Sequence, residues 1–239
     1  MDIYRRLAAE FGGALVLTAV VIGSGVMGVR LAGGSDAIAL LANTGATAAI
    51  LYVLITALAP ISGAHCNPAV TLVMAIQRGL SVGDAVVYIA AQIAGCVAGA
   101  MLAHALFELP LIQLGAHVRA GGAQALSEGA ATFALVGCIL LVSRARAEAV
   151  PAAVALTIAA GYWWTSSTSF ANPAITIARA LSDTFAGIRP QDAPGFIAAQ
   201  FAGALAAMLA CGWIYPARAR SAQAVSTAAA IRSVSNSGG

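Results

Sequence analysis

The chain alternates between long apolar stretches and short polar connections. Six of the stretches approach the roughly 20 residues needed to cross a bilayer core of about 30 Å. We expect helices over them, at residues 7–29, 38–60, 84–107, 123–142, 149–166 and 194–215. Two shorter apolar segments, 67–77 and 172–182, each follow a stretch of membrane length. The pattern therefore predicts an all-α membrane protein with six transmembrane helices and two short re-entrant half-helices.

Each short segment begins with the same three residues. The triplets are Asn67-Pro68-Ala69 and Asn172-Pro173-Ala174. Asn is a favoured residue just before a helix, and Pro suits the first helical position, where its missing N–H is not needed. The Asn side-chain oxygen can then accept a bond from the new helix, which leaves its amide hydrogens free to donate elsewhere. Because such backbone is tolerated at membrane depth only inside protein or beside a watery cavity, we expect both helix starts to line one.

The two halves of the chain repeat each other. Asn172 follows Asn67 by 105 residues (172 − 67), Gln200 follows Gln92 by 108 (200 − 92), and Glu128 follows Glu10 by 118 (128 − 10). Each half holds three spans, an odd number, so the halves should lie in opposite orientations, with a site near the midplane between them. We expect a single channel domain over residues 1–216, with repeats at about 5–107 and 121–215, and a disordered cytoplasmic tail at 217–239.

Inversion has a consequence for charge. Both half-helices should point their N-termini at the bilayer centre, and a helix N-terminus carries partial positive charge and free N–H groups. Two such ends facing one lumen repel cations. Asn67 and Asn172 then offer two donors to a passing oxygen, and a water held by both can donate to neither. The sequence therefore predicts a pore for small uncharged solutes that excludes ions and protons.

The motifs also resemble those of a known family. Ser62-Gly-Ala-His-Cys-Asn-Pro-Ala-Val-Thr71, Ala9-Glu-Phe-Gly12 and Asn172-Pro-Ala174 are similar to aquaporin (major intrinsic protein) motifs. The resemblance covers about residues 5–215. It implies six helices and two half-helices around one pore per subunit, usually in a homotetramer, with water and small neutral solutes as the permeating molecules.

The chain departs from that family at its selectivity filter. In most members an Arg directly follows the second Asn-Pro-Ala, whereas Ile175 stands here. The family's offsets place the other filter positions at Thr47, Ala160 and Ser169. All four side chains are small or aliphatic and uncharged, which favours solutes larger than water. The resemblance to bacterial arsenic-associated aquaglyceroporins implies glycerol-like polyols and undissociated metalloid acids such as arsenous acid.

Arg179 lies four residues after Ile175, so on a helix it occupies the same face one turn further outward. Two interpretations stand at this point. Its guanidinium could line the outer vestibule and partly replace the missing filter Arg. Alternatively, it could be a helix-end Arg that extends to the membrane surface or pairs with Asp183.

Glu10 and Glu128 lie in or near apolar spans, where a charge is costly and often functional. A proton-coupled transporter could use such a pair. The repeat favours a scaffold role instead, in which each carboxylate accepts bonds from the unwound backbone before a half-helix. The resemblance to aquaporins implies the same role. His65 is expected to support its loop or to line the pore, because a lone His beside Cys66 makes a poor metal site.

Composition and charge narrow the remaining choices. The chain of 239 residues is 60% hydrophobic and 9% charged, against about 25% charged in soluble domains. Its 12 basic residues, all Arg, exceed 9 acidic ones too slightly to favour a nucleic-acid partner. Arg5, Arg6, Arg78, Arg144, Arg146, Arg218, Arg220 and Arg232 fall on one predicted side, and Arg30, Arg119 and Arg189 on the other. This asymmetry predicts that both termini lie in the cytoplasm, and we expect the protein in the plasma membrane.

Several function classes remain to be separated. The pattern favours a passive channel, with a water-selective channel as the nearest alternative. A secondary transporter with broken helices would also fit the inverted repeat. An intramembrane enzyme is disfavoured because no catalytic set is visible, and we expect neither a metal nor a cofactor.

Overall fold

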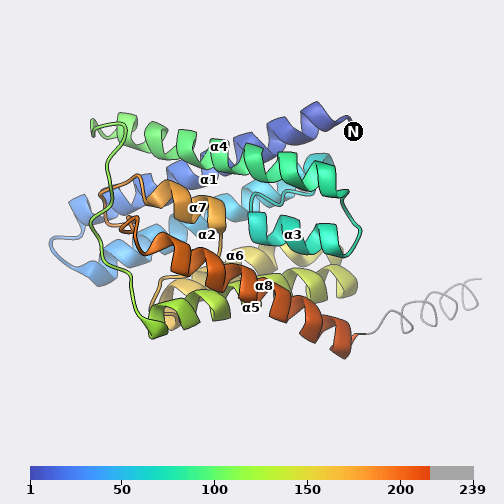
Figure 1. Cartoon of the computed structure of the whole chain (residues 1–239). Coiled ribbons are helices and arrows are strands. Elements are labelled where there is room, and N and C mark those ends of the chain that lie inside the picture. The colour runs from blue at the N-terminus through green and yellow to red at the C-terminus, as the bar shows by residue number, and fades with distance from the viewer. Residues whose placement is uncertain (216–239) are drawn as a thin grey trace, which may run out of the picture.

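The computed structural model describes residues 1–215, and the predicted tail at 217–239 lies outside these described residues. Within them every regular element is helical (Figure 1). The elements are α1 (Ile3–Leu31), α2 (Asp36–Ser62), α3 (Pro68–Ile76), α4 (Val82–Leu106), α5 (Gly122–Ala145), the 3-10 turn η1 (Ala147–Ala149), α6 (Val150–Trp164), α7 (Pro173–Arg179) and α8 (Ala193–Ile214).

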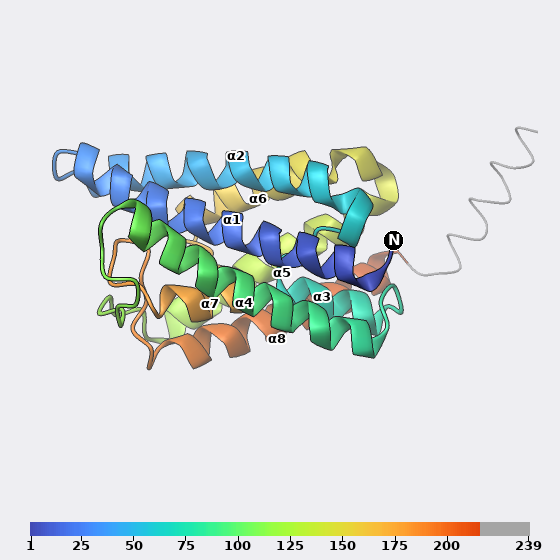
Figure 2. The ribbon, with the colours of Figure 1, turned by 90° about the horizontal axis from the view of Figure 1, so that it is seen from above.

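Five helices are long and apolar enough to cross a membrane, namely α1, α2, α4, α5 and α8. The sixth predicted span forms as α6, with 15 residues, about 22 Å at 1.5 Å per residue. It is shorter than predicted because the 3-10 turn η1 precedes it and Thr165, after Trp164, is extended. In both views α1 begins and α8 ends at the same end of the bundle (Figures 1 and 2).

Glycines let the long helices pack at short distance in matching pairs. Helix α4 lies along α1 (Figure 2), where a Cβ added at Gly95 would lie 2.3 Å from the Phe11 carbonyl oxygen. Helix α8 packs on α5 in the same way, with a Cβ at Gly203 falling 2.1 Å from the carbonyl oxygen of Gly129. Small residues commonly allow such close approach in membranes. The two contacts hold equivalent helix pairs in the two halves.

Replacing Gly203 with alanine is expected to force α5 and α8 apart and to destabilise the fold by about 1–3 kcal/mol. The midpoint of thermal unfolding in detergent should fall by a few degrees. Gly12→Ala is the matched control, because an added Cβ there meets nothing within 4 Å. Equal midpoints for the two variants would contradict the proposed tight contact.

The two half-helices form where the Asn-Pro-Ala triplets predict them. Asn67 and Asn172 are extended residues whose side-chain oxygens accept bonds from Ala69 N at 2.9 Å and Ala174 N at 3.0 Å. Helix α3 ends within a residue of its predicted end, whereas α7 ends at Arg179 instead of the expected Ser182. The carbonyl of Arg179 accepts from the amides of Ser182 and Ile188, which replaces the next α-helical bond.

Candidate functional site

The two half-helices are joined at their starting points by reciprocal hydrogen bonds. Nδ2 of Asn67 donates to the carbonyl of Ala171 at 2.7 Å, and Nδ2 of Asn172 donates to the carbonyl of Cys66 at 2.8 Å. Figure 1 shows α3 and α7 pointing toward each other in the middle of the bundle. Each amide has two hydrogens, so one on each Asn remains for another partner. Both Asn side chains line the same cavity.

The loop before α3 is held by the carboxylate of Glu10. Its oxygens accept four bonds, from Ser62 Oγ (2.6 Å), His65 N (2.9 Å), Cys66 N (2.7 Å) and Gln92 Nε2 (2.7 Å). Glu10 is fully buried. All four partners are donors, so a proton on either oxygen would displace one of them. Glu10 therefore connects the loop before α3 to α4.

Glu128 repeats this arrangement in the second half. It accepts from Ser167 Oγ (2.6 Å), Phe170 N (2.9 Å), Ala171 N (2.9 Å) and Gln200 Nε2 (2.6 Å). The loop partners follow their counterparts around Glu10 by the 105 residues that separate the two triplets. Gln92 and Gln200 also donate to Thr71 and Thr176, each at 2.9 Å. The two loops are therefore structural copies.

These carboxylates hold backbone that side chains ordinarily avoid. Positive φ angles occur at Ala64 (48°) and Cys66 (43°), and at the equivalent Ser169 (52°) and Ala171 (47°). Non-glycine residues in this region cost about 1–3 kcal/mol each and persist where surrounding contacts over-determine them. The backbone conformation places the Cys66 and Ala171 carbonyls where the opposing Asn side chains reach them.

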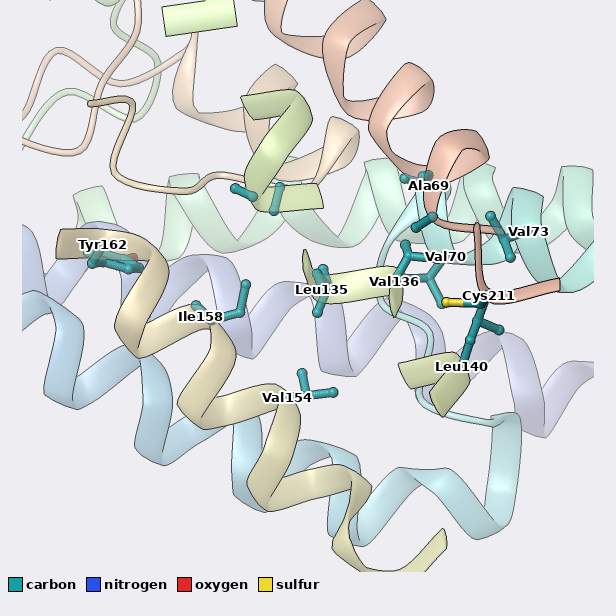
Figure 3. Close-up of a cluster of buried hydrophobic side chains, with 14 residues drawn as sticks. Ala69, Val70, Val73, Leu135, Val136, Leu140, Val154, Ile158, Tyr162 and Cys211 are labelled. Carbon is teal, nitrogen blue, oxygen red and sulfur yellow. The ribbon is translucent and has the colours of Figure 1, made fainter. Parts of the chain in front are cut away.

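A cavity of about 100 Å³ runs past both triplets, enough for several waters. One wall is polar and contains the two loops with Asn67 and Asn172. The opposite wall is apolar and comes from α1, α2, α5 and α6. Helix α6 contributes the four-residue series Val150, Val154, Ile158 and Tyr162. Figure 3 shows Val154 and Ile158 projecting from α6 toward Leu135 of α5.

Three of the four predicted filter residues line this cavity. These are Thr47, Ser169 and Ile175, and Thr47 Oγ1 is 3.1 Å from the hydroxyl of Tyr162. Ala160 requires a correction, because it is exposed on the outside of α6. It lies two residues after Ile158, which on a helix is the opposite face. Gly161 packs against Ser169 instead.

Arg179 is buried, 2% exposed, and lines the cavity one turn beyond Ile175. Its guanidinium carbon lies 3.2 Å from the centroid of the Phe170 ring, and its Nε donates to the carbonyl of Ala186. The alternative pairing with Asp183 does not form, because that carboxylate accepts from the amide of Ala116. The geometry therefore agrees with the interpretation that places Arg179 beside the lumen.

Arg119, one of the Arg residues that the charge distribution assigned to the outer side of the membrane, is buried, with 7% of its surface exposed. Its Nε, Nη1 and Nη2 donate to the carbonyls of Gly187 (2.9 Å), Ser167 (3.2 Å) and Phe185 (3.4 Å). Its guanidinium carbon lies 5.1 Å from the Phe170 centroid. Burial lowers the pKa of Arg119 to about 10, so it stays charged at neutral pH. The acceptors of Arg119 are distant from it in sequence, so no local pattern predicts its burial. The one available signal was the presence of a charged residue in a largely apolar chain.

His65 lies at the α3 side of the cavity, where its ring forms part of the lining. Nδ1 is 3.2 Å from Thr71 Oγ1, and the ring meets Tyr88 edge to face at 5.6 Å. The backbone amide of His65 donates to Glu10 at 2.9 Å, and its residue also lines the cavity. Within residues 1–215 no group of three His, Cys, Asp or Glu side chains is arranged to hold a metal ion.

Comparison with known proteins gives consistent matches. The sequence profile described as "Major intrinsic protein" matches residues 1–165. The chain is 51% identical over 218 residues to aquaglyceroporin AqpS of Rhizobium meliloti (strain 1021), covering 91% of this chain and 93% of that protein. It is 35% identical over 147 residues to probable aquaporin PIP2-8 of Oryza sativa subsp. japonica, covering 59% and 50%.

The fold has a counterpart among solved structures. The X-ray structure of the aquaglyceroporin from Plasmodium falciparum matches with a TM-score of 0.71, covering 87% of this chain and 95% of that one. The sequence identity is 18%, so this likeness concerns the fold alone. It confirms the predicted all-helical architecture with half-helices.

Proposed function

Because the chain belongs to the major intrinsic protein family, we propose that it is a passive membrane channel for small uncharged solutes. Members of this family are multi-pass membrane channels and not enzymes. The substrates that we propose are glycerol-like polyols, undissociated trivalent metalloid acids such as arsenous acid, and water. Ions and protons are excluded. The activity needs no cofactor and no energy source, and the direction of flow follows the gradient.

The observation that carries this proposal is the meeting of two helix N-termini on one cavity. Asn67 and Asn172 both line this cavity, and each donates one amide hydrogen to a carbonyl of the opposing loop. The other hydrogens are available to a solute oxygen, and the helix ends add positive potential. A water that accepts from both Asn residues has to point its own hydrogens away along the pore. This orientation interrupts proton passage, and the potential opposes cations.

The lining around Ile175 supports solutes larger than water. Thr47, Ser169 and Ile175 are small or aliphatic, so nothing directly after Asn172 narrows the passage with a charged side chain. The apolar wall suits a carbon backbone, and the polar wall suits hydroxyl groups. The relative named aquaglyceroporin AqpS supports the same proposal. A water-selective channel is the alternative that this lining disfavours.

The carboxylates argue against a proton-coupled transporter. Each of the two buried acids already accepts four bonds from its loop and its neighbouring helix. Taking up and releasing a proton would break a loop contact in every cycle. We therefore assign Glu10 and Glu128 to the scaffold, together with His65.

For its setting we propose a plasma membrane, both termini in the cytoplasm, and a homotetramer. The sequence distribution of Arg supports this orientation. Large apolar side chains are exposed along the long helices, among them Leu41, Val86, Leu126 and Leu209. Such surfaces suit lipid tails and neighbouring subunits.

The test is solute entry into proteoliposomes, followed by stopped-flow light scattering. We expect glycerol and arsenous acid to enter at least about tenfold faster than into empty liposomes, which corresponds to a barrier lowered by about 1.4 kcal/mol. The rate of entry should rise linearly with the solute gradient and should not change when a pH gradient is imposed. Saturating, proton-driven uptake would favour the transporter, and entry of water alone would favour the water-selective channel.

A further inference from the structure

At the α7 end of the cavity, two buried guanidinium groups share one aromatic ring. The Phe170 ring has the guanidinium carbon of Arg179 at 3.2 Å and that of Arg119 at 5.1 Å from its centroid. Phe196 of α8 meets the same ring edge to face at 5.1 Å, which fixes its plane. Among residues 1–215, neither Arg forms an ion pair with a carboxylate. Burying two like charges without a counter-charge is costly, and charged residues buried in a membrane protein often have a function.

The guanidinium of Arg179 keeps donors available to the lumen. Nε donates to the carbonyl of Ala186, and this is the one hydrogen bond that the Arg179 side chain makes within residues 1–215. The residue lines the cavity, and we take its terminal nitrogens, Nη1 and Nη2, as the donors that a passing solute meets. They supply hydrogen-bond donors and a positive charge, which Ile175, the residue after the second Asn-Pro-Ala, does not.

The repeat shows that the scaffold does not require this charge. The position 105 residues before Arg179 is Met74, which lines the cavity at the opposite end. Likewise Val70 is the counterpart of Ile175, and both line the cavity. The same half-helix geometry is thus compatible with an apolar side chain at this place. A cation occurs at one end of the cavity only.

Arg119 has a different role from Arg179. All three of its nitrogen groups donate to backbone carbonyls, of Ser167 before α7 and of Phe185 and Gly187 after it. It therefore ties together the segments on both sides of the half-helix. One of these segments contains Phe170, and the other contains Ala186, the acceptor for Arg179. Both contacts of Arg179 depend on the segments that Arg119 joins.

We infer that Arg179 is the specificity-determining cation of the outer mouth, set one helical turn beyond the usual filter position, and that Arg119 is the positioning residue that holds it there. The inference rests on the proposed channel function. Arg179 repels entering cations and offers donors to neutral oxygen-rich solutes. Because Arg179 lies one helical turn away from the usual filter position, the space beside Ile175 stays open. The channel can therefore exclude cations and still have a wide passage.

Sodium entry and glycerol entry into the same proteoliposomes test the role of Arg179. In Arg179→Met and Arg179→Gln, sodium entry should rise at least about tenfold, because a charge barrier of 1.4 kcal/mol or more is removed. The Gln side chain can still donate to the Ala186 carbonyl, so Arg179→Gln removes the charge while keeping this contact. Arg179→Lys should retain most of the exclusion. Unchanged sodium entry in the neutral variants, with glycerol entry present, would overturn the inference.

Arg30→Met is the matched control for charge. Arg30 lies in the last turn of α1 and also stacks on an aromatic ring, Phe107 at 5.1 Å, but it is exposed. Its loss should leave sodium entry at the wild-type value. An equal rise in Arg30→Met would assign the effect to general surface charge and overturn the inference. Absence of glycerol entry in the wild-type protein would instead contradict the channel function itself.

Non-additivity tests the positioning role of Arg119. Arg119→Met should raise sodium entry by itself, but it should add nothing in an Arg179→Met background, because it acts through Arg179. Arg119→Lys keeps a charge but cannot make three directed bonds, so its leak should lie between those of the wild type and Arg119→Met. Additive leaks in the double variant would show an independent effect and overturn the positioning role.

Discussion

Replacing Ile175 with arginine is expected to close the channel to glycerol and arsenous acid while water continues to enter. Ile175 is buried in the first turn of α7 and lines the cavity with Thr47 and Ser169. A longer, charged side chain there would occupy the space that we propose for hydroxyl-bearing solutes. It would also place a second cation one turn from Arg179. We expect the ratio of glycerol to water permeability to fall at least about tenfold, since a narrowed site discriminates by 1.4 kcal/mol or more.

Stopped-flow measurements of both solutes on the same vesicle preparation give this ratio directly. Ile175→Met is the matched control, because it lengthens the side chain without adding charge or a guanidinium. It should lower the ratio far less than arginine does. If Ile175→Arg kept the wild-type ratio, solutes would pass elsewhere than beside α7, and the filter assignment would be wrong.

Replacing Glu128 with alanine is expected to abolish correct assembly of the second half. Four donors would lose their acceptor at once, namely Ser167 Oγ, Phe170 N, Ala171 N and Gln200 Nε2. Each unsatisfied buried donor costs about 1–3 kcal/mol, and together they rival a typical folding stability of about 5–15 kcal/mol. Little folded protein should be recovered from detergent, and solute entry should drop to the level of empty liposomes.

Glu148→Ala is the control, because its carboxylate is exposed and, within residues 1–215, forms its ion pair with Arg146 alone. Glu128→Gln separates the scaffold role from proton coupling. The Gln amide retains one acceptor oxygen, but its NH₂ group would face donors that now bond to the carboxylate. We therefore expect less folded protein to be recovered from Glu128→Gln than from the wild type. A Glu128→Gln protein that was fully stable, carried solute, and had lost only a dependence on pH would contradict the scaffold role and favour a transporter.

The central features of the site could be predicted from sequence because they are local and occur twice. Asn-Pro-Ala encodes a helix start within three residues, and its recurrence fixed how the halves relate. The scaffold hypothesis for the buried acids came from the repeat, which places one acid and one unwound segment before a half-helix in each half of the chain. The structure then supplied the donors that satisfy Glu10 and Glu128.

The features that were missed depend on contacts between distant segments. Ala160 was placed by counting back from Asn172, but counting does not fix which face of α6 meets the lumen. The side chain of Arg119 is buried because residues 167, 185 and 187 offer it carbonyls, and no local pattern encodes this. The early end of α7 likewise reflects the approach of Ile188 to the Arg179 carbonyl.

The exchanged Asn hydrogen bonds also bear on how the protein is made. A ribosome delivers Cys66 and Asn67 about a hundred residues before Ala171 and Asn172. Until the later pair arrives, the earlier loop has a donor and an acceptor without their final partners. Glu10 can hold the first loop from within the first half, but the two exchanged bonds form only after the second half has been synthesised. A truncated chain that contains only the first Asn-Pro-Ala would lack the Ala171 carbonyl and the Asn172 amide, so neither exchanged bond could form.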